Sequence, residues 1–390
     1  MRIPSTGPGV VLDLIRLRVA TTRRDLLERL GWSRVTLERR LDELTDAGLI
    51  VVAGAQPSRG GRPREEFEVA RDAGLILAVE IGGTHTRLGL TDLVSNVLAV
   101  EEADIGLYSG PDEVFSWARQ VLDFVFARIG RRRADVRAIG IGVPGPVEAT
   151  TGRLGPVQPD ARWAGIDPRQ LLSPEAFDAV VAVDRDVNML AVGEARLGWP
   201  EYENLVIVKA GMGVGVALVL DGRVHRGSRG GAGQLSARGV PLDGQFLPLE
   251  SVASGAVIRE RLAERGRIVT TSAEIVELAK AGDRYALHLL DEVGETIGTS
   301  LAEAVGALNP EAVVVGGSLV EAGERFLGSI RSGILSHSLP LARRGLVIER
   351  NRLGESAAVR GASLVAQDAL FDADRVDSMI REGRNFVTNL

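Results

Sequence analysis

The chain has 390 residues, of which 46 are basic and 52 acidic, so its formal net charge is −6, and it contains no cysteine. This length predicts two or three domains, and the apolar and charged fractions of 45% and 25% are typical of globular proteins. The lack of cysteine excludes disulfides, thiolate nucleophiles and cysteine-bound zinc. No apolar run approaches the ~20 residues that cross a bilayer, and no signal-peptide core is present, so we expect a cytoplasmic protein with no membrane partner.

The charge is unevenly distributed along the chain. Residues 1–64 hold 12 arginines against seven acidic residues, a balance of +5, which leaves −11 for residues 65–390. A basic N-terminal head on an acidic body favours polyanion binding by the head, although ordinary solvated surface charge can also give such a balance.

Three helices are predicted in the basic head. The first spans residues 10–20, the second follows a capping box at Thr22, and the third runs from Ser33 to about residue 47. Leucines at i, i+4 and i+7 give the third helix an apolar face, and arginines occupy its other face. A short helix, a glycine turn and an arginine-rich helix are typical of a helix-turn-helix, whose DNA contacts we predict from this third helix. These predicted DNA-binding residues are Ser33, Arg34, Thr36, Arg39 and Arg40.

A wing is predicted after the third helix. Residues 49–53 and 67–69 have the composition of strands, and the loop between them is polar and basic. Its extended Gly-Arg-Pro-Arg segment would allow Arg62 and Arg64 to enter a narrow minor groove of double-stranded DNA. Surface arginines on two helices also occur in other proteins, the loop would serve equally as a linker, and some winged helices dock onto proteins.

The remainder of the chain alternates predicted strands and helices, which is typical of an α/β fold. We therefore place a winged helix-turn-helix domain at residues 1–71 and a larger α/β domain at residues 72–390. Glycine-dense turns directly follow four of the predicted strands, and glycine lets backbone N–H groups approach a phosphate closely. The turn residues of interest are Gly82, Gly83, Thr84, Gly211, Gly213, Gly316 and Gly317, together with the segment 140–146.

In the order of these turns and in its basic head, the chain resembles the ROK family of repressors and sugar kinases. The resemblance extends from the DNA-reading segment to Gly361 and Ala362, and it is to the regulators that carry a winged helix, such as the xylose and N-acetylglucosamine repressors. It implies a two-lobed, actin-like sugar-kinase fold with the ligand cleft between the lobes, and a homodimer or tetramer.

The chain departs from the family's kinases where they hold phosphate and zinc. The resemblance places Glu80 and His85 where the kinases have Asp and Lys, and Met212 where a threonine hydroxyl would meet a phosphate. Prolines 241 and 248 and Asp243 stand in place of the three zinc-binding cysteines. We therefore expect neither a metal site nor an ATP–Mg cofactor.

The resemblance also marks candidate sugar-binding residues. Asp186 matches the kinases' catalytic base, which deprotonates a sugar hydroxyl. Arg185 replaces an asparagine beside it, and it would either pair with Asp186 and weaken that base or turn away toward Asp184 or Glu194. Trp163 matches an aromatic near the sugar but serves equally as core. The other candidates carried over from the family pattern are Gln234, Ser236, Glu250 and Asp160.

These losses favour a ligand sensor over an enzyme. The sequence predicts a DNA-binding transcriptional regulator that represses carbohydrate-metabolism genes. Its expected partners are double-stranded operator DNA and a small carbohydrate, with nucleoid association when DNA is bound. Two alternatives stay open: an active ATP-dependent sugar kinase with a DNA-binding head, which the surviving Asp186 favours, and a regulator of a sugar acid or sugar phosphate, for which Arg185 would supply the charge.

Overall fold

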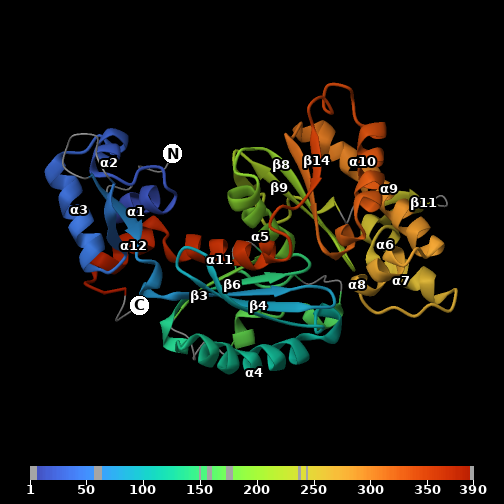
Figure 1. Cartoon of the computed structure of the whole chain (residues 1–390), viewed down its shortest axis with the longest axis horizontal. Coiled ribbons are helices and arrows are strands. Elements are labelled where there is room, and N and C mark those ends of the chain that lie inside the picture. Colours follow the sequence, from blue (N-terminus) through green and yellow to red (C-terminus); the bar gives the residue numbers. More distant parts are fainter. Residues whose placement is uncertain are drawn as a thin grey trace.

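The computed structural model of the chain describes residues 7–56, 64–148, 151–155, 160–172, 179–235, 239–242 and 245–386. They form an N-terminal head and two lobes, and each lobe contains a five-stranded sheet (Figure 1). The α/β class predicted from the sequence is confirmed.

The head contains three helices and a two-stranded antiparallel sheet, and residues predicted as caps begin two of its helices. Thr22 accepts a hydrogen bond from the backbone N–H of Asp25, and Ser33 accepts one from the backbone N–H of Thr36. The first helix ends earlier than predicted because Arg18 has a left-handed backbone with φ of 54°. The elements are α1 (Pro8–Arg16), α2 (Arg23–Leu30), α3 (Arg34–Asp46), β1 (Ile50–Gln56) and β2 (Arg64–Val69).

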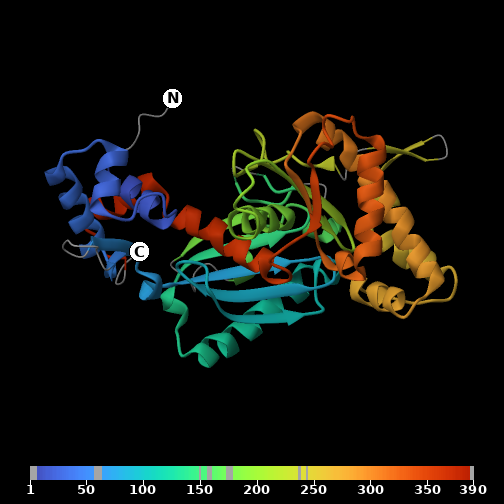
Figure 2. The ribbon, with the colours of Figure 1, turned by 45° about the horizontal axis from the view of Figure 1, so that its top comes forward.

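The core of the head is completed by the other end of the chain. Helix α12 (Ala373–Arg381) packs against α1, and Phe371 and Phe386 are fully buried together with the leucines of α3. The sequence did not predict this contact, because nothing in the local pattern of residues 370–386 indicates a partner at the start of the chain. Figure 2 shows the head beside the C-terminal helices and separated from the second lobe.

The sheets of the two lobes repeat the same arrangement. In each, a three-stranded antiparallel meander comes first and two parallel strands then extend the sheet. The first lobe has the order β5 (Val97–Ala103), β4 (Thr86–Asp92), β3 (Leu75–Ile81), β6 (Val136–Val143), β7 (Val180–Arg185). The second has the order β10 (Arg223–His225), β9 (Val214–Leu220), β8 (Leu205–Ala210), β13 (Ala312–Gly316), β14 (Val347–Arg350).

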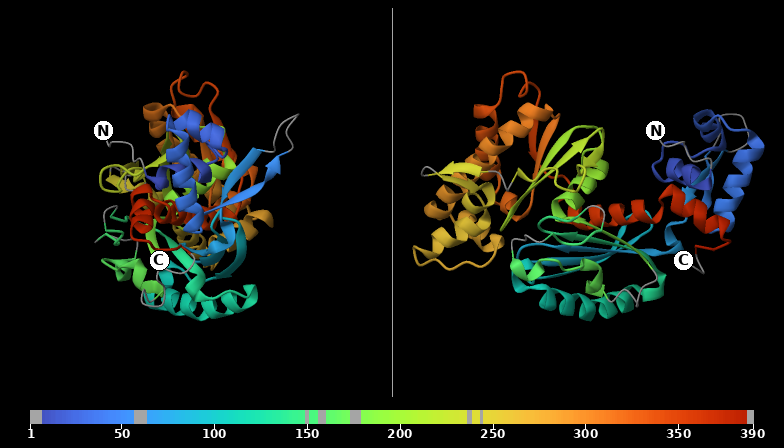
Figure 3. Two further views of the ribbon diagram at one scale, coloured as in Figure 1. Left: turned by 90° about the vertical axis from the view of Figure 1, so that its left-hand side faces the viewer. Right: turned by 180° about the vertical axis from the view of Figure 1, so that it is seen from behind.

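Helices cover both faces of the first sheet. Helix α4 (Pro111–Ile129) covers one face, and α5 (Asp186–Gly193) and α11 (Ser356–Leu370) lie on the other (Figure 3). The second lobe buries its sheet mainly against α9 and α10, with three shorter helices and a β-hairpin beside them. These elements are α6 (Leu249–Val252), α7 (Gly255–Ala263), α8 (Ser272–Lys280), α9 (Arg284–Leu308), α10 (Glu324–His337), β11 (Gly239–Leu242) and β12 (Gln245–Pro248).

The chain crosses between the lobes twice, and both crossings run through helices that touch. Helix α5 leads toward β8 in the second lobe, and the segment after β14 returns to α11. A methyl group at Gly361 of α11 would lie 1.7 Å from the carbonyl oxygen of Met189 in α5, so the two backbones are in direct contact. The two helices therefore act as one unit at the junction of the lobes.

Replacing Gly361 by alanine is expected to destabilise the protein by about 1–3 kcal/mol, because the added methyl group must separate α5 from α11. Gly328 in α10 has open space at its Cβ position, and Gly328→Ala is expected to be neutral or stabilising by about 0.5–1 kcal/mol. Thermal unfolding followed by circular dichroism compares the two variants. Equal melting temperatures would contradict the close contact of the two helices.

Candidate functional site

A cavity of about 840 Å³ lies between the lobes, and residues from both sheets line it. The glycine turns after β3 and β8 face each other across it through Gly82, Gly83, Gly211 and Gly213. Thr84 and Gly317 also line the cavity. Gly316 lies behind it, with Leu190 and Asn351 close to the position that its Cβ would take.

A lysine from the second lobe joins two carboxylates of the first lobe inside this cavity. The Nζ of Lys209, near the end of β8, lies 2.6 Å from Glu80 Oε1 and 2.7 Å from Asp186 Oδ2. The Glu80 side chain is buried and the other two are only 14% exposed, so these charges are strongly coupled. The carboxylate that matches the kinases' base is therefore bonded to an ammonium group.

The electrostatics of this network are set by competition between burial and charge. Burial alone would raise the pKa of Glu80, but Lys209, with His85 and Arg87 nearby, holds that pKa well below its usual range. Burial would likewise lower the pKa of Lys209, and the carboxylates of Asp186 and Glu80 instead raise it. Glu80 and Lys209 are thus both charged at neutral pH.

Arg185 takes neither of the two positions considered from the sequence. Its guanidinium is buried and donates hydrogen bonds to the carbonyl oxygens of Ala232, at 3.0 Å, and Val216, at 3.2 Å. Burial lowers the pKa of Arg185. Asp184 pairs instead with Arg226, at 2.6 Å. Arg185 consequently ties the end of β7 to the second lobe with two of its five N–H donors, and it also lines the cavity.

The candidate sugar-binding residues fall into two groups. Gln234 and Glu250 line the cavity, and burial raises the pKa of Glu250, whose Oε1 accepts a hydrogen bond from the backbone N–H of Val214. Asp160 instead pairs with Arg162, at 2.6 Å, and Trp163 is a core residue whose indole donates to the carbonyl of Leu107. Ser236 lies outside the described residues.

The nucleotide side of the cavity departs from a phosphate cradle. Met212, the middle residue of the second glycine turn, is almost fully buried, and its Cβ lies 3.2 Å from the position that a Cβ on Gly83 of the first turn would take. An apolar side chain there supplies no hydrogen-bond donor for a phosphate, and the Lys209 ammonium is already bonded to the nearest carboxylates. These residues do not fit a bound ATP–Mg.

The zinc site of the family is not reproduced by the residues present. The positions of its cysteines fall in and around the hairpin of β11 and β12, where Pro241 and Pro248 occur, while Asp243 lies outside the described residues. Within the described ranges no cluster of three histidine or carboxylate side chains is placed to hold a metal ion. Prolines offer no ligand atom in their side chains, so this chain does not fit the zinc.

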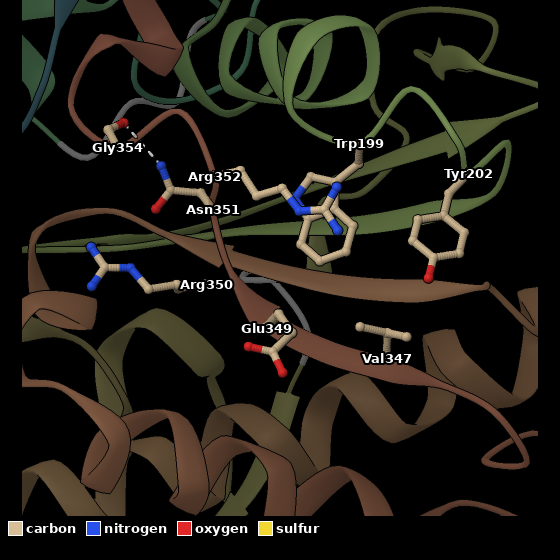
Figure 4. A pocket seen from close by; sticks show the side chains of 8 residues that line it. All are labelled: Trp199, Tyr202, Val347, Glu349, Arg350, Asn351, Arg352 and Gly354. Carbon is tan, nitrogen blue, oxygen red and sulfur yellow. Dashed lines mark hydrogen bonds between the residues drawn. The ribbon is translucent and has the colours of Figure 1, made fainter.

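A second pocket, of about 630 Å³, is lined by Trp199 and Tyr202 and by residues of β14 and the return to α11 (Figure 4). The guanidinium carbon of Arg352 lies 3.5 Å from the centre of the Trp199 ring, and the side-chain amide of Asn351 donates to the carbonyl of Gly354. Asn351 and Gly354 also line the interlobe cavity, so this segment separates the two spaces.

The predicted DNA-binding residues of α3 have distinct surroundings. Arg34 and Arg39 are exposed, whereas the hydroxyls of Ser33 and Thr36 bond to each other within the helix cap. Arg40 is half-buried and bonded to Glu43, at 2.8 Å, rather than facing outward. In the predicted wing, Arg62 lies outside the described residues, and the structure describes only the backbone of Arg64, in β2.

Three charged residues that the sequence analysis missed connect the head to the lobes. Asp368, near the end of α11, pairs with Arg16 of α1 at 2.7 Å and with Arg196 at 2.5 Å. Arg196 belongs to a π-helical turn that continues α5. Burial would raise the pKa of Asp368, but the two arginines lower it below its usual range. No local pattern indicates this bridge, because Asp368 is 172 and 352 residues away from its two partners.

These features define a two-lobed protein of the sugar-kinase type that carries a winged helix-turn-helix. The chain matches the ROK family over residues 76–369 and belongs to it. No helix among the described residues is long and apolar enough to span a membrane.

Regulators and kinases of the family differ in how much of this chain they match. The xylose repressor of Caldicellulosiruptor bescii is 26% identical over 93% of this chain and 95% of its own length. A glucokinase of Halalkalibacterium halodurans is 27% identical but covers 73% of this chain and 92% of its own. A solved ROK family transcriptional regulator, a homologue of the Escherichia coli MLC protein, has a TM-score of 0.76 at 24% identity and covers 95% of this chain and 98% of its own. The regulators therefore match the head as well as the lobes.

Proposed function

We propose that the protein is a DNA-binding transcriptional repressor of carbohydrate-metabolism genes, controlled by a sugar or sugar derivative in the interlobe cavity. One observation carries the proposal: Lys209 is bonded to both carboxylates, Glu80 and Asp186, at the position where a kinase of this family needs a free base. The relatives that match nearly the whole chain bear the same function in their names.

The network also opposes the rival function of a sugar kinase. A general base must be within hydrogen-bond reach of the proton that it removes and must be free to accept it. Asp186 is held by an ammonium whose pKa is raised, and the buried side chain of Met212 lies in one of the two turns that would cradle phosphate, against the other. We therefore propose that the protein works without ATP, Mg²⁺ or zinc.

The cavity favours an uncharged sugar as its ligand. Gln234, Glu250 and Asp186 line it and offer hydrogen-bonding groups suited to hydroxyls. Arg185, the residue that would attract a sugar acid or phosphate, is held by hydrogen bonds to two backbone carbonyls, which use two of its five N–H donors. We propose the neutral sugar as the effector, and the charged derivatives are the alternative.

We further propose that the protein acts as a homodimer or tetramer on operator DNA. Two heads related by a two-fold axis would contact two half-sites, and closure of the lobes around the sugar would change the spacing of the heads. Light scattering of the purified protein, alone and with DNA, measures the number of chains.

The proposed function is tested by a thermal-shift screen of the purified chain against xylose, glucose, N-acetylglucosamine and their acid and phosphate derivatives, each with and without Mg-ATP. A ligand that binds only the folded state raises the melting temperature. We expect a neutral sugar to raise it equally with and without Mg-ATP. Sugar-dependent ADP release that is lost in Asp186→Asn would establish the kinase instead.

The wing provides a separate prediction about DNA. Arg62→Ala is expected to weaken operator binding and to reduce the slope of log affinity against log salt by ~0.9, the value for one lost phosphate contact. Arg325→Ala, which removes an exposed arginine from the second lobe, is the matched control and is expected to leave the slope unchanged. An unaltered slope and affinity in Arg62→Ala would remove the wing from the interface.

A further inference from the structure

An apolar side chain is presented to solvent at the tip of α3. Val35 is 81% exposed, the highest value among the large apolar side chains that the structure describes. It is the second residue of the helix, directly after Arg34. Valine gains nothing there from helix propensity, since its β-branch is less favourable than a straight or small side chain. No packing within the described part of the chain accounts for it.

The neighbours of Val35 form the outward face of the helix. Arg39 and Asp42 follow it at i+4 and i+7, and both are exposed. The buried Leu37 and Leu41 lie on the opposite face and anchor the helix in the head core. The outward face therefore combines one apolar group with charged groups.

The tip of the helix is also held rigidly. Ser33 caps it through the backbone N–H of Thr36, at 3.1 Å. Arg23 of α2 bonds to Glu38 of α3, at 2.9 Å, and to Glu65 of β2, so one guanidinium joins α2, α3 and β2. Val35 is consequently displayed at a fixed position rather than on a mobile segment, at the end of α3 that begins after the turn from α2 (Figure 1).

We propose that Val35 contacts the 5-methyl group of a thymine in the major groove and so fixes one base pair of the operator half-site. The inference rests on the proposed DNA-binding function and extends it to a residue that determines specificity. The N-terminal residues of a recognition helix lie nearest the base edges, and thymine alone presents a methyl group there. Arg34 and Arg39, on either side, are placed for phosphates or guanine.

The test of this contact begins with selection of the operator itself. Binding sites are selected from a random-sequence duplex library with the full-length protein. Each thymine of the selected site is then replaced singly by deoxyuridine, which removes only the methyl group, and affinities are measured for wild type and Val35→Ala.

For the wild type we expect one thymine per half-site whose replacement weakens binding by about fourfold, the effect of one buried methyl group. Val35→Ala is expected to be insensitive to that same replacement, because the side chain that covers the methyl group is gone. Val94→Ala, at an exposed valine of the first lobe, is the control and should keep the wild-type pattern.

Two results would overturn the inference, and they are distinguishable. A selected site in which Val35→Ala and wild type lose the same affinity at every deoxyuridine would contradict the Val35 contact alone. Recovery of no preferred sequence by the wild-type protein would contradict the proposed function and the contact with it.

Discussion

Replacing Lys209 by methionine is expected to lower the free energy of unfolding by about 3–5 kcal/mol at neutral pH. Methionine is unbranched and only one atom shorter than lysine, but it leaves Glu80 and Asp186 in the cavity without their cation, and an uncompensated buried charge is strongly destabilising. Lys280 is the only other lysine in the chain and is half-exposed in a pair with Glu277. Lys280→Met is the matched control, with an expected change within about 0.5 kcal/mol.

The pH dependence of this loss follows from the direction of the pKa shifts. The pKa of Glu80 is lowered by folding, so its contribution is present above its unfolded value and is lost as the pH falls. The pKa of Lys209 is raised, so its contribution is present below its unfolded value and is lost only at strongly alkaline pH. Urea unfolding of wild type and Lys209→Met should therefore differ most near pH 7 and converge as the pH falls below about 5. A difference independent of pH would contradict the charged network.

Replacing Asp368 by asparagine is expected to leave sugar binding intact while removing its effect on DNA binding. Asp368 bonds both to Arg16 in the head and to Arg196, which continues the interlobe helix α5. Coupling between two sites is typically 5- to 150-fold in affinity, and the variant should approach no change. The measurement is DNA affinity with and without the sugar identified by the thermal-shift screen.

The control for this prediction is Asp13→Asn, which removes the other carboxylate bonded to Arg16. That pair lies within α1, so its loss should preserve the response to sugar. If both variants kept the full response, the bridge through Asp368 would carry no coupling.

The parts of the fold that the sequence predicted are those determined by neighbouring residues. Thr22 and Ser33 begin their helices as expected because a cap acts on a backbone N–H three residues away. The strands and the glycine turns that follow them are likewise indicated by residues that lie close together in the sequence. The prediction for α1 was less accurate, because an arginine gives no sign that its backbone will be left-handed, as that of Arg18 is.

The parts that the sequence did not predict depend on contacts between distant segments. The partners of Lys209 are 129 and 23 residues away, and the carbonyls that bind Arg185 belong to the other lobe. One signal in the sequence nevertheless points to Lys209 as a functional residue. Lys209 lies two residues before the glycine turn that begins at Gly211, and all but one of the other basic residues of the chain are arginines, so a lysine at this position is unusual.

The burial of Phe371, Val376, Met379 and Phe386 in the head has a consequence for how the protein is made. Residues 7–69 of the head are translated before the two lobes, whereas these side chains are translated after them. The core of the head therefore stays incomplete until both lobes have been synthesised.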